Sequence, residues 1–327
     1  MKIAIAVSPQ FPCPPVDYAG NPMQADILAR KLVARGHNVI LLCGPNSTSP
    51  VCRIGASSPT TEAEWEYVSW LRGNVEKWDC VWDMTASHLI SQDCGLPKGS
   101  STIAHMLGDP HRLYPHDTVR NRVYCSYQLA DFYGCPAHPV LHNIISYDPD
   151  SIPIGDGSGG YALYIGTIRP EKGIDVAARA CRRLGLCLKV GGEIQKRFRP
   201  YWQSFEDIVD FIGPVPCGDK WKLFGEASVF MLPINWCDAG PLVVMESLLV
   251  GTPVIACPVG GLLDDVVDGE NGFLCPREEF ATTLDRTLQI SWNRESIRAG
   301  ILPKIDPDRY VDTVESLCKV VVKGKRW

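Results

Sequence analysis

Residues 234–273 constrain the fold of this chain more than any other stretch, because they place an apolar helix between turn residues. The run LVVMESLLV is apolar on every side apart from Glu246 and the serine after it, and a helix of that kind is buried. Pro241 suits the first helical position with Gly240 as N-cap, and Gly251 suits a left-handed residue after the helix end. The segment therefore predicts a loop, a buried helix, a strand, a glycine loop and a second short helix.

Glu246 needs a partner in such a helix, because a buried carboxylate is costly unless it is hydrogen-bonded. Either it pairs with an arginine inside the core, or it faces a cleft and accepts hydrogen bonds from ligand hydroxyls. Asp238 lies in the loop that leads to the helix N-terminus. That terminus, near Gly240, Leu242 and Val243, offers unpaired N–H groups and positive potential, which favour phosphate. This layout suits a sugar nucleotide.

The string DAGPLVVMESLLVGTPVIACPVGGLLDDVVDGENGFL resembles the nucleotide-sugar segment of retaining GT-B glycosyltransferases. This is the family of glycosyl transferases group 1, which includes glycogen synthase, sucrose synthase and bacterial mannosyltransferases. Where the family has two glutamates separated by seven residues, this chain has Asp238 and Glu246. Gly240 and Pro241 replace Phe-Gly, and Asp264 replaces a usual glutamate. The resemblance implies that Asp238 holds hydroxyls of the donor sugar and that Glu246 holds the ribose hydroxyls.

The motif GTIRPEKG, residues 166–173, is the second chemical signal. In the family, an arginine and a lysine five residues apart clamp the two donor phosphates. Lys172 matches the lysine, whereas Thr167 stands at the arginine position and Arg169 follows two residues later. With Gly166 at the start of the turn, the resemblance implies a diphosphate site whose cations stabilise the leaving group. The alternative is a solvated basic turn.

Other positions follow from the same resemblance. Gly20 matches a glycine of the family's first loop, where the backbone approaches the donor phosphates, although an ordinary turn is the alternative. Gly213 and Val215 stand where the family holds the base through its main chain. His105 follows a strand at the edge where open α/β sheets bind ligands, and in the family it lines the reacting centre. A structural histidine is the alternative.

The composition limits the partners of this 327-residue chain. A net charge of −5 without a basic stripe argues against nucleic acid as the main partner, and it leaves membrane association at most peripheral. Fourteen cysteines without a C-x-x-C, and seven histidines without metal-ligand spacing, predict a reduced, cytoplasmic protein with no metal and no cofactor. We expect neither a signal peptide nor a membrane span, since no apolar run approaches the roughly 20 residues that a span needs.

Strand–helix alternation runs through both halves of the chain, which predicts an α/β protein with parallel sheets. The glycine-rich stretch SIPIGDGSGG at 151–160 reads as a linker. Together with the resemblance, this predicts a GT-B fold in which two Rossmann-like domains face each other across a cleft. We expect an acceptor-side domain over 1–150, a nucleotide-sugar-binding domain over 151–308, and a C-terminal helix over 309–327 that packs back toward the first domain.

The implied activity is transfer of a hexose from a UDP- or GDP-sugar to an acceptor hydroxyl on a sugar, glycan or small molecule. The resemblance implies retention of anomeric configuration without a metal, with His105, Asp238, Arg169 and Lys172 at the reacting centre. One alternative is a sugar-nucleotide-binding protein of the same fold without transfer activity. Another is a GT-B-shaped epimerase or phosphorylase. An epimerase would need distinctively spaced carboxylates in the first domain, and the sequence shows none.

Overall fold

In a computed structural model of the chain, the described residues are 1–327 except 17–18, 93–95, 97–99, 108–118, 149–150 and 217. They form two compact units. Unit 1 comprises Met1–Ser146 and Ile305–Trp327, and unit 2 comprises Tyr147–Lys304. The domain boundaries expected at residues 150 and 308 each lie four residues beyond these limits.

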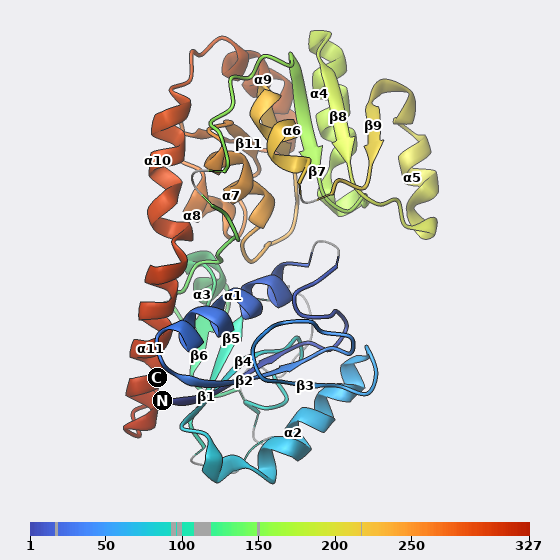
Figure 1. Cartoon of the computed structure of the whole chain (residues 1–327). Coiled ribbons are helices and arrows are strands. Elements are labelled where there is room, and N and C mark those ends of the chain that lie inside the picture. Colours follow the sequence, from blue (N-terminus) through green and yellow to red (C-terminus); the bar gives the residue numbers. More distant parts are fainter. Residues whose placement is uncertain (17–18, 93–95, 97–99, 108–118, 149–150, 217) are drawn as a thin grey trace. The chain divides into compact units, whose positions relative to one another are not determined.

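Unit 1 is built on a six-stranded parallel sheet in the order β3-β2-β1-β4-β5-β6 (Figure 1). Its strands are β1 (Lys2–Val7), β2 (Asn38–Cys43), β3 (Arg53–Gly55), β4 (Cys80–Met84), β5 (Thr102–Met106) and β6 (Arg122–Tyr124). Its helices are α1 (Gly20–Ala34), α2 (Glu64–Arg72), α3 (Tyr127–Phe132) and α11 (Pro307–Val322).

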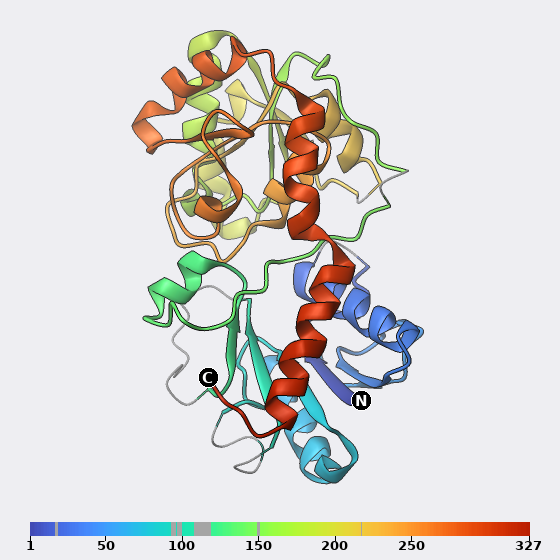
Figure 2. The same cartoon turned by 90° about the vertical axis from the view of Figure 1, so that its left-hand side faces the viewer.

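The sheet of unit 1 is buried on both faces, as parallel sheets require. Along β1, Ile3 and Ile5 belong to a core cluster shared with α1 and α11, whereas Ala4 and Ala6 belong to a second cluster shared with α2. Helix α11 comes from the end of the chain and packs against α1, β4 and β5 (Figure 2). Its buried apolar side chains complete the first cluster; they are Tyr310, Val311, Val314, Cys318 and Val321.

Unit 2 repeats this architecture, with a six-stranded parallel sheet in the order β12-β11-β10-β7-β8-β9. Its strands are β7 (Tyr161–Ile165), β8 (Cys187–Gly191), β9 (Asp210–Gly213), β10 (Val229–Leu232), β11 (Val254–Ala256) and β12 (Gly272–Leu274). Its α-helices are α4 (Ile174–Leu184), α5 (Arg199–Gln203), α6 (Lys220–Glu226), α7 (Leu242–Leu249), α8 (Leu262–Asp265), α9 (Phe280–Leu288) and α10 (Arg294–Ile305).

The central helix of residues 234–273 forms as α7, and seven of its eight residues are buried. Gly251 adopts φ +81° directly after the C-cap residue Val250, which confirms the predicted left-handed stop. The predicted start is one residue early, because Pro241 has extended backbone angles and occupies the N-cap position itself. The described part of the chain therefore has the predicted α/β class, with one Rossmann-like sheet in each unit.

Candidate active site

Two loops meet at the topological switch point of the sheet in unit 2. Residues 166–173 follow β7 and residues 233–241 follow β10, and these two strands pair with each other. From this pair the remaining strands continue in opposite directions. Open α/β sheets bind ligands at the carboxyl ends of such strands. Both loops carry residues that the sequence predicts for the site.

Lys172 and Asp238 lie in contact across these loops. Lys172 ends a 3₁₀ turn, η4 (Pro170–Lys172), and its Nζ donates to Asp238 Oδ2 at 3.2 Å. The side chains are 14% and 20% exposed, so the pair is shielded from bulk water yet open on one side. The second oxygen, Oδ1, accepts from the backbone N–H of Gly240 at 3.3 Å. The predicted phosphate cation and the predicted sugar carboxylate thus form one site.

Trp236 organises the cations of this site. The Nζ of Lys172 lies 4.3 Å from the centre of its ring, and the guanidinium carbon of Arg169 lies 5.5 Å from it. The Nε of Arg169 is buried and has no hydrogen-bond partner among the described atoms. A buried donor without a partner suits an anionic ligand. Sequence reasoning missed Trp236, although a tryptophan two residues before a predicted site carboxylate is a usable signal.

Glycines let the segments around the site approach one another closely, including the segment of Gly260 and Gly261 between β11 and α8. Gly260 adopts φ +55°, and a Cβ at this position would overlap the carbonyl oxygen of Asp238. The next residue, Gly261, donates its N–H to that same oxygen at 2.8 Å. Gly173, with φ +68°, leaves equally little room between its backbone and the carbonyl of Pro233. The Gly-Gly element therefore fixes the backbone that carries Asp238.

Glu246 lies on α7 and is 1% exposed. Its Oε1 accepts a hydrogen bond from Lys220 Nζ at 2.6 Å, and the side chain of Lys220 is 9% exposed. Of the two possibilities open in the sequence, the structure favours an internal cation as the partner. The cation is a lysine at the start of α6, whereas the alternative considered in the sequence was an arginine. This ion pair gives no support for the prediction that Glu246 binds the ribose hydroxyls of the donor.

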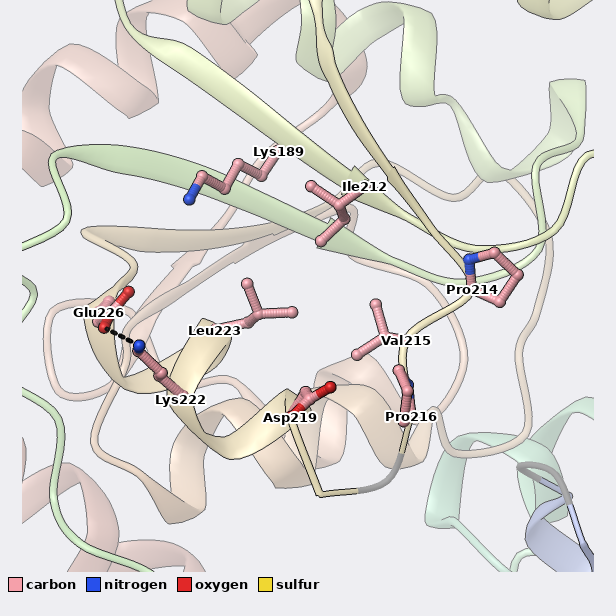
Figure 3. A pocket seen from close by; sticks show the side chains of 9 residues that line it. All are labelled: Lys189, Ile212, Pro214, Val215, Pro216, Asp219, Lys222, Leu223 and Glu226. Atoms are coloured by element: carbon pink, nitrogen blue, oxygen red, sulfur yellow. Dashed lines mark ion pairs between the residues drawn. The ribbon is translucent and has the colours of Figure 1, made fainter.

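The positions predicted for the base lie at the carboxyl end of β9. Gly213 adopts φ +75° and accepts a hydrogen bond from Gly192 N–H at 2.8 Å, while Gly166 donates to the carbonyl of Gly191 at 3.0 Å. Val215 follows and lines a hollow of about 410 Å³ between the β8–β9 edge and α6 (Figure 3). The other lining residues are Lys189, Ile212, Pro214, Pro216, Asp219, Lys222, Leu223 and Glu226.

The two remaining predicted residues belong to unit 1. Gly20 is the first residue of α1. His105 lies in β5, fully buried, with Nε2 near the carbonyl of Leu141 at 3.2 Å and Nδ1 near the hydroxyl of Tyr310 at 3.1 Å. Burial lowers the pKa of His105 to about 3, so the ring is neutral at physiological pH. This environment is that of a core histidine, and it gives no support for a role at the reacting centre.

Unit 1 holds a buried acidic pair at its own switch point, which sequence reasoning missed. Glu64 accepts hydrogen bonds from Ser87 and from Ser8, the latter at 3.2 Å, and these serines follow β4 and β1. Asp83 in β4 accepts from the hydroxyl of Thr85 at 2.7 Å. Burial raises the pKa of Glu64 above its ordinary value. Both carboxylates are fully buried, and hydrogen bonds from neighbouring hydroxyl groups satisfy them.

Metal sites and membrane-spanning helices each require a particular arrangement of side chains, which the described part of the chain lacks. Among the described residues, no group of three or more histidine, cysteine, aspartate or glutamate side chains is placed to hold a metal ion. Across that same part of the chain, no helix has the length and apolarity needed to span a bilayer.

Comparison with solved structures defines the class of fold. AviGT4, a glycosyltransferase involved in avilamycin A biosynthesis, superposes with a TM-score of 0.76 at 22% identity, over 100% of this chain and 99% of that one. Anabaena Alr3699/HepE superposes with a TM-score of 0.75 at 13% identity, over 97% and 99%. The chain has the GT-B fold, as predicted.

Sequence comparison then shows which family the second unit resembles. Residues 156–299 match the family described as glycosyl transferases group 1. D-inositol 3-phosphate glycosyltransferase of Acidothermus cellulolyticus is 30% identical over 209 residues, which is 53% of this chain and 46% of that protein. Putative colanic acid biosynthesis glycosyltransferase WcaL of Salmonella typhimurium is 27% identical over 143 residues, 39% and 35% of the two chains.

The aligned stretch spans less than half the length of these two curated relatives. The family match at residues 156–299 contains both chemical motifs, 166–173 and 234–273. Residues within unit 2 thus match glycosyl transferases group 1, in agreement with the resemblance drawn from residues 234–273.

Proposed function

We propose that this protein is a retaining glycosyltransferase that moves a hexose from a nucleotide diphosphate sugar to an acceptor hydroxyl, without a metal ion. The observation that carries this proposal is the contact of Lys172 with Asp238 at the switch point of unit 2, beside Trp236 and Arg169. A cation for phosphate and a carboxylate for sugar hydroxyls are the two groups that a sugar nucleotide requires side by side.

When the donor binds, Lys172 and Asp238 would each exchange their mutual contact for a contact with the donor. The diphosphate would attract the Lys172 ammonium and the unpaired Nε of Arg169, because charge-assisted hydrogen bonds to phosphate are strong. Asp238 would then accept hydrogen bonds from hydroxyls of the hexose and position its anomeric carbon. As the bond to the sugar breaks, these fixed cations would stabilise the charge on the leaving diphosphate. This is the task that a metal ion performs in other transferases.

We propose UDP- or GDP-hexose as the donor and a sugar, glycan or small molecule as the acceptor, in cytoplasmic glycan biosynthesis. Support for a uridine nucleotide comes from the fold neighbour HepE, whose structures contain UDP, UDP with glucose, and UDP-glucose. The leaving phosphate would help to deprotonate the acceptor on the face where the new bond forms, which retains the configuration.

The decisive experiment offers UDP-, GDP-, ADP- and dTDP-hexoses to the wild-type protein and measures release of the nucleotide diphosphate with and without candidate acceptors. Lys172→Ala and Asp238→Ala are expected to lower turnover by about 10²- to 10³-fold. Lys319→Ala is the matched control, because Lys319 is an exposed lysine whose ion pair with Glu315 lies on α11, outside the two loops and outside the hollow beside Val215. Turnover within a few-fold of wild type in both site variants would refute the assignment.

A non-transferring sugar-nucleotide-binding protein is the second candidate, and the Lys220–Glu246 pair favours it. If Glu246 is engaged by an internal lysine, one predicted contact to the donor is lost. Such a protein would bind a nucleotide, which a thermal-shift panel detects, but it would release no free sugar from any donor. A slow release of sugar in the absence of acceptor distinguishes the enzyme from the binder.

A further inference from the structure

Arg277 connects the two loops of the candidate site through hydrogen bonds to their backbone carbonyl groups. It begins the 3₁₀ turn η7 (Arg277–Glu279), which follows β12. Its Nε donates to the carbonyl oxygen of Pro233 at 2.8 Å, and its Nη2 donates to the carbonyl oxygen of Glu171 at 2.7 Å. One guanidinium therefore binds two backbone oxygens that are far apart in the sequence.

These two oxygens belong to the segments that carry the site. Glu171 directly precedes Lys172 in η4, and Pro233 is the first residue after β10, in the segment that leads to Trp236 and Asp238. The two segments also bond directly, since Asn235 N–H donates to the same Glu171 oxygen at 3.2 Å. The position of Lys172 relative to Asp238 thus depends on a junction that contains Arg277.

The junction has little free space. A Cβ on Gly173 would overlap the Pro233 carbonyl and would lie 2.6 Å from Arg277 Nη2. The planar guanidinium offers several N–H donors in a fixed fork. Lysine carries a compact ammonium on a flexible stem, so it cannot reproduce that fork at both oxygens.

On its outer side, Arg277 lines a groove of about 480 Å³ between α4 and α9. Arg183 of α4 lines the same groove, but none of the described hydrogen bonds joins it to either loop. This arrangement supplies a matched pair of arginines, one that bonds the loops and one that does not. It also gives a small solute a route to the space that a shortened residue 277 would leave.

We propose that Arg277 is a positioning residue for the diphosphate site. It does not contact the donor; it holds the η4 turn against the segment after β10, so that Lys172, Trp236 and Asp238 keep their mutual geometry. The inference rests on the proposed function. Its physical core, the coupling of the two loops, can be measured without any donor.

The first measurement is hydrogen–deuterium exchange on the intact protein. Arg277→Ala is expected to speed exchange in peptides that cover 166–173 and 233–241 while leaving β8 unchanged, and Arg183→Ala is expected to change neither loop. Unaltered exchange in both loops of Arg277→Ala would overturn the inference. Faster exchange throughout unit 2 would also overturn it, because it would show a general loss of folding.

The second measurement separates binding from turnover. Misplacing a binding group by about 1 Å can cost about 10²-fold, so Arg277→Ala should raise the KM for the donor by about 10- to 100-fold. Because Lys172 is also proposed to stabilise the leaving diphosphate, kcat should fall as well, and Arg277→Lys should lie between wild type and Arg277→Ala. Methylguanidinium at millimolar concentration should restore part of the donor affinity of Arg277→Ala but none of that of Lys172→Ala. A donor KM within twofold of wild type, despite faster loop exchange, would refute the inference.

Failure of the proposed function leaves a different pattern. If the wild-type protein transfers no sugar but still binds UDP, the dissociation constant of UDP is measured in place of the donor KM. Arg277→Ala is then expected to raise that constant by the same factor of about 10- to 100-fold. If the wild-type protein binds no nucleotide at all, the proposed function is refuted and the inference about its diphosphate site falls with it.

Discussion

The Lys220–Glu246 pair can be tested by a double-mutant cycle. Glu246→Leu leaves a lysine ammonium buried without its counter-charge, and Lys220→Met does the same to the carboxylate. With side chains 9% and 1% exposed, solvent screens neither charge effectively. Removing one partner of a buried ion pair costs about 3–5 kcal/mol, whereas replacing both by apolar groups of similar size is close to neutral or stabilising by about 1–4 kcal/mol.

We therefore expect each single variant to lose about 3–5 kcal/mol of unfolding free energy, and the double variant to recover most of it. Urea denaturation followed by far-UV circular dichroism measures the unfolding free energy of the wild type, the two single variants and the double variant. Single variants that each lose less than about 1 kcal/mol, or losses that simply add, would refute the reasoning. The stable double variant then tests ligand binding, because unchanged stabilisation by UDP would exclude Glu246 as a ribose ligand.

Three further outcomes follow from burial and backbone geometry. Burial raises the pKa of Asp265 to about 7, so its contribution to stability is complete below about pH 4 and is lost as the pH rises through 7. Asp265→Asn should therefore gain up to about 4 kcal/mol over wild type in urea titrations between pH 4 and pH 8, while the exposed Asp285→Asn gains nothing. His105→Ala should lower the unfolding free energy by about 2–4 kcal/mol, because it removes a packed ring and two hydrogen bonds; a stable variant that loses transfer would contradict this. Gly260→Ala should weaken nucleotide binding in a thermal-shift assay, whereas Gly269→Ala, with φ +77° and open space around it, should cost only about 1 kcal/mol of backbone strain; equal effects of the two would refute the role of close contact.

The fold was largely predictable because its strands are continuous apolar runs that alternate with helices, and each run gives a local signal. Gly251 was predictable for the same reason, since a left-handed stop depends on one residue and its neighbours. The short strand β3 (Arg53–Gly55) was not predicted, because three residues carry too little pattern.

The site was predictable in its parts but not in its contacts. Lys172 and Asp238 each stand in a recognisable motif, yet their pairing depends on how β7 and β10 lie in the sheet. The need of Glu246 for a cation followed from its burial, but its partner Lys220 lies on another helix, α6, and the sequence does not show how α6 packs against α7. Arg277 acts through backbone carbonyls, which leave no trace in the identity of the residues that they belong to.

The return of α11 to unit 1 affects how the protein is made. Unit 2 is one continuous stretch, so it can fold as soon as residue 304 has left the ribosome. Unit 1 was synthesised earlier, yet it lacks part of its core until the final helix emerges. Unit 1 therefore begins to be translated first but is completed last, and its apolar surface around α1 and β4 stays uncovered by α11 during that interval.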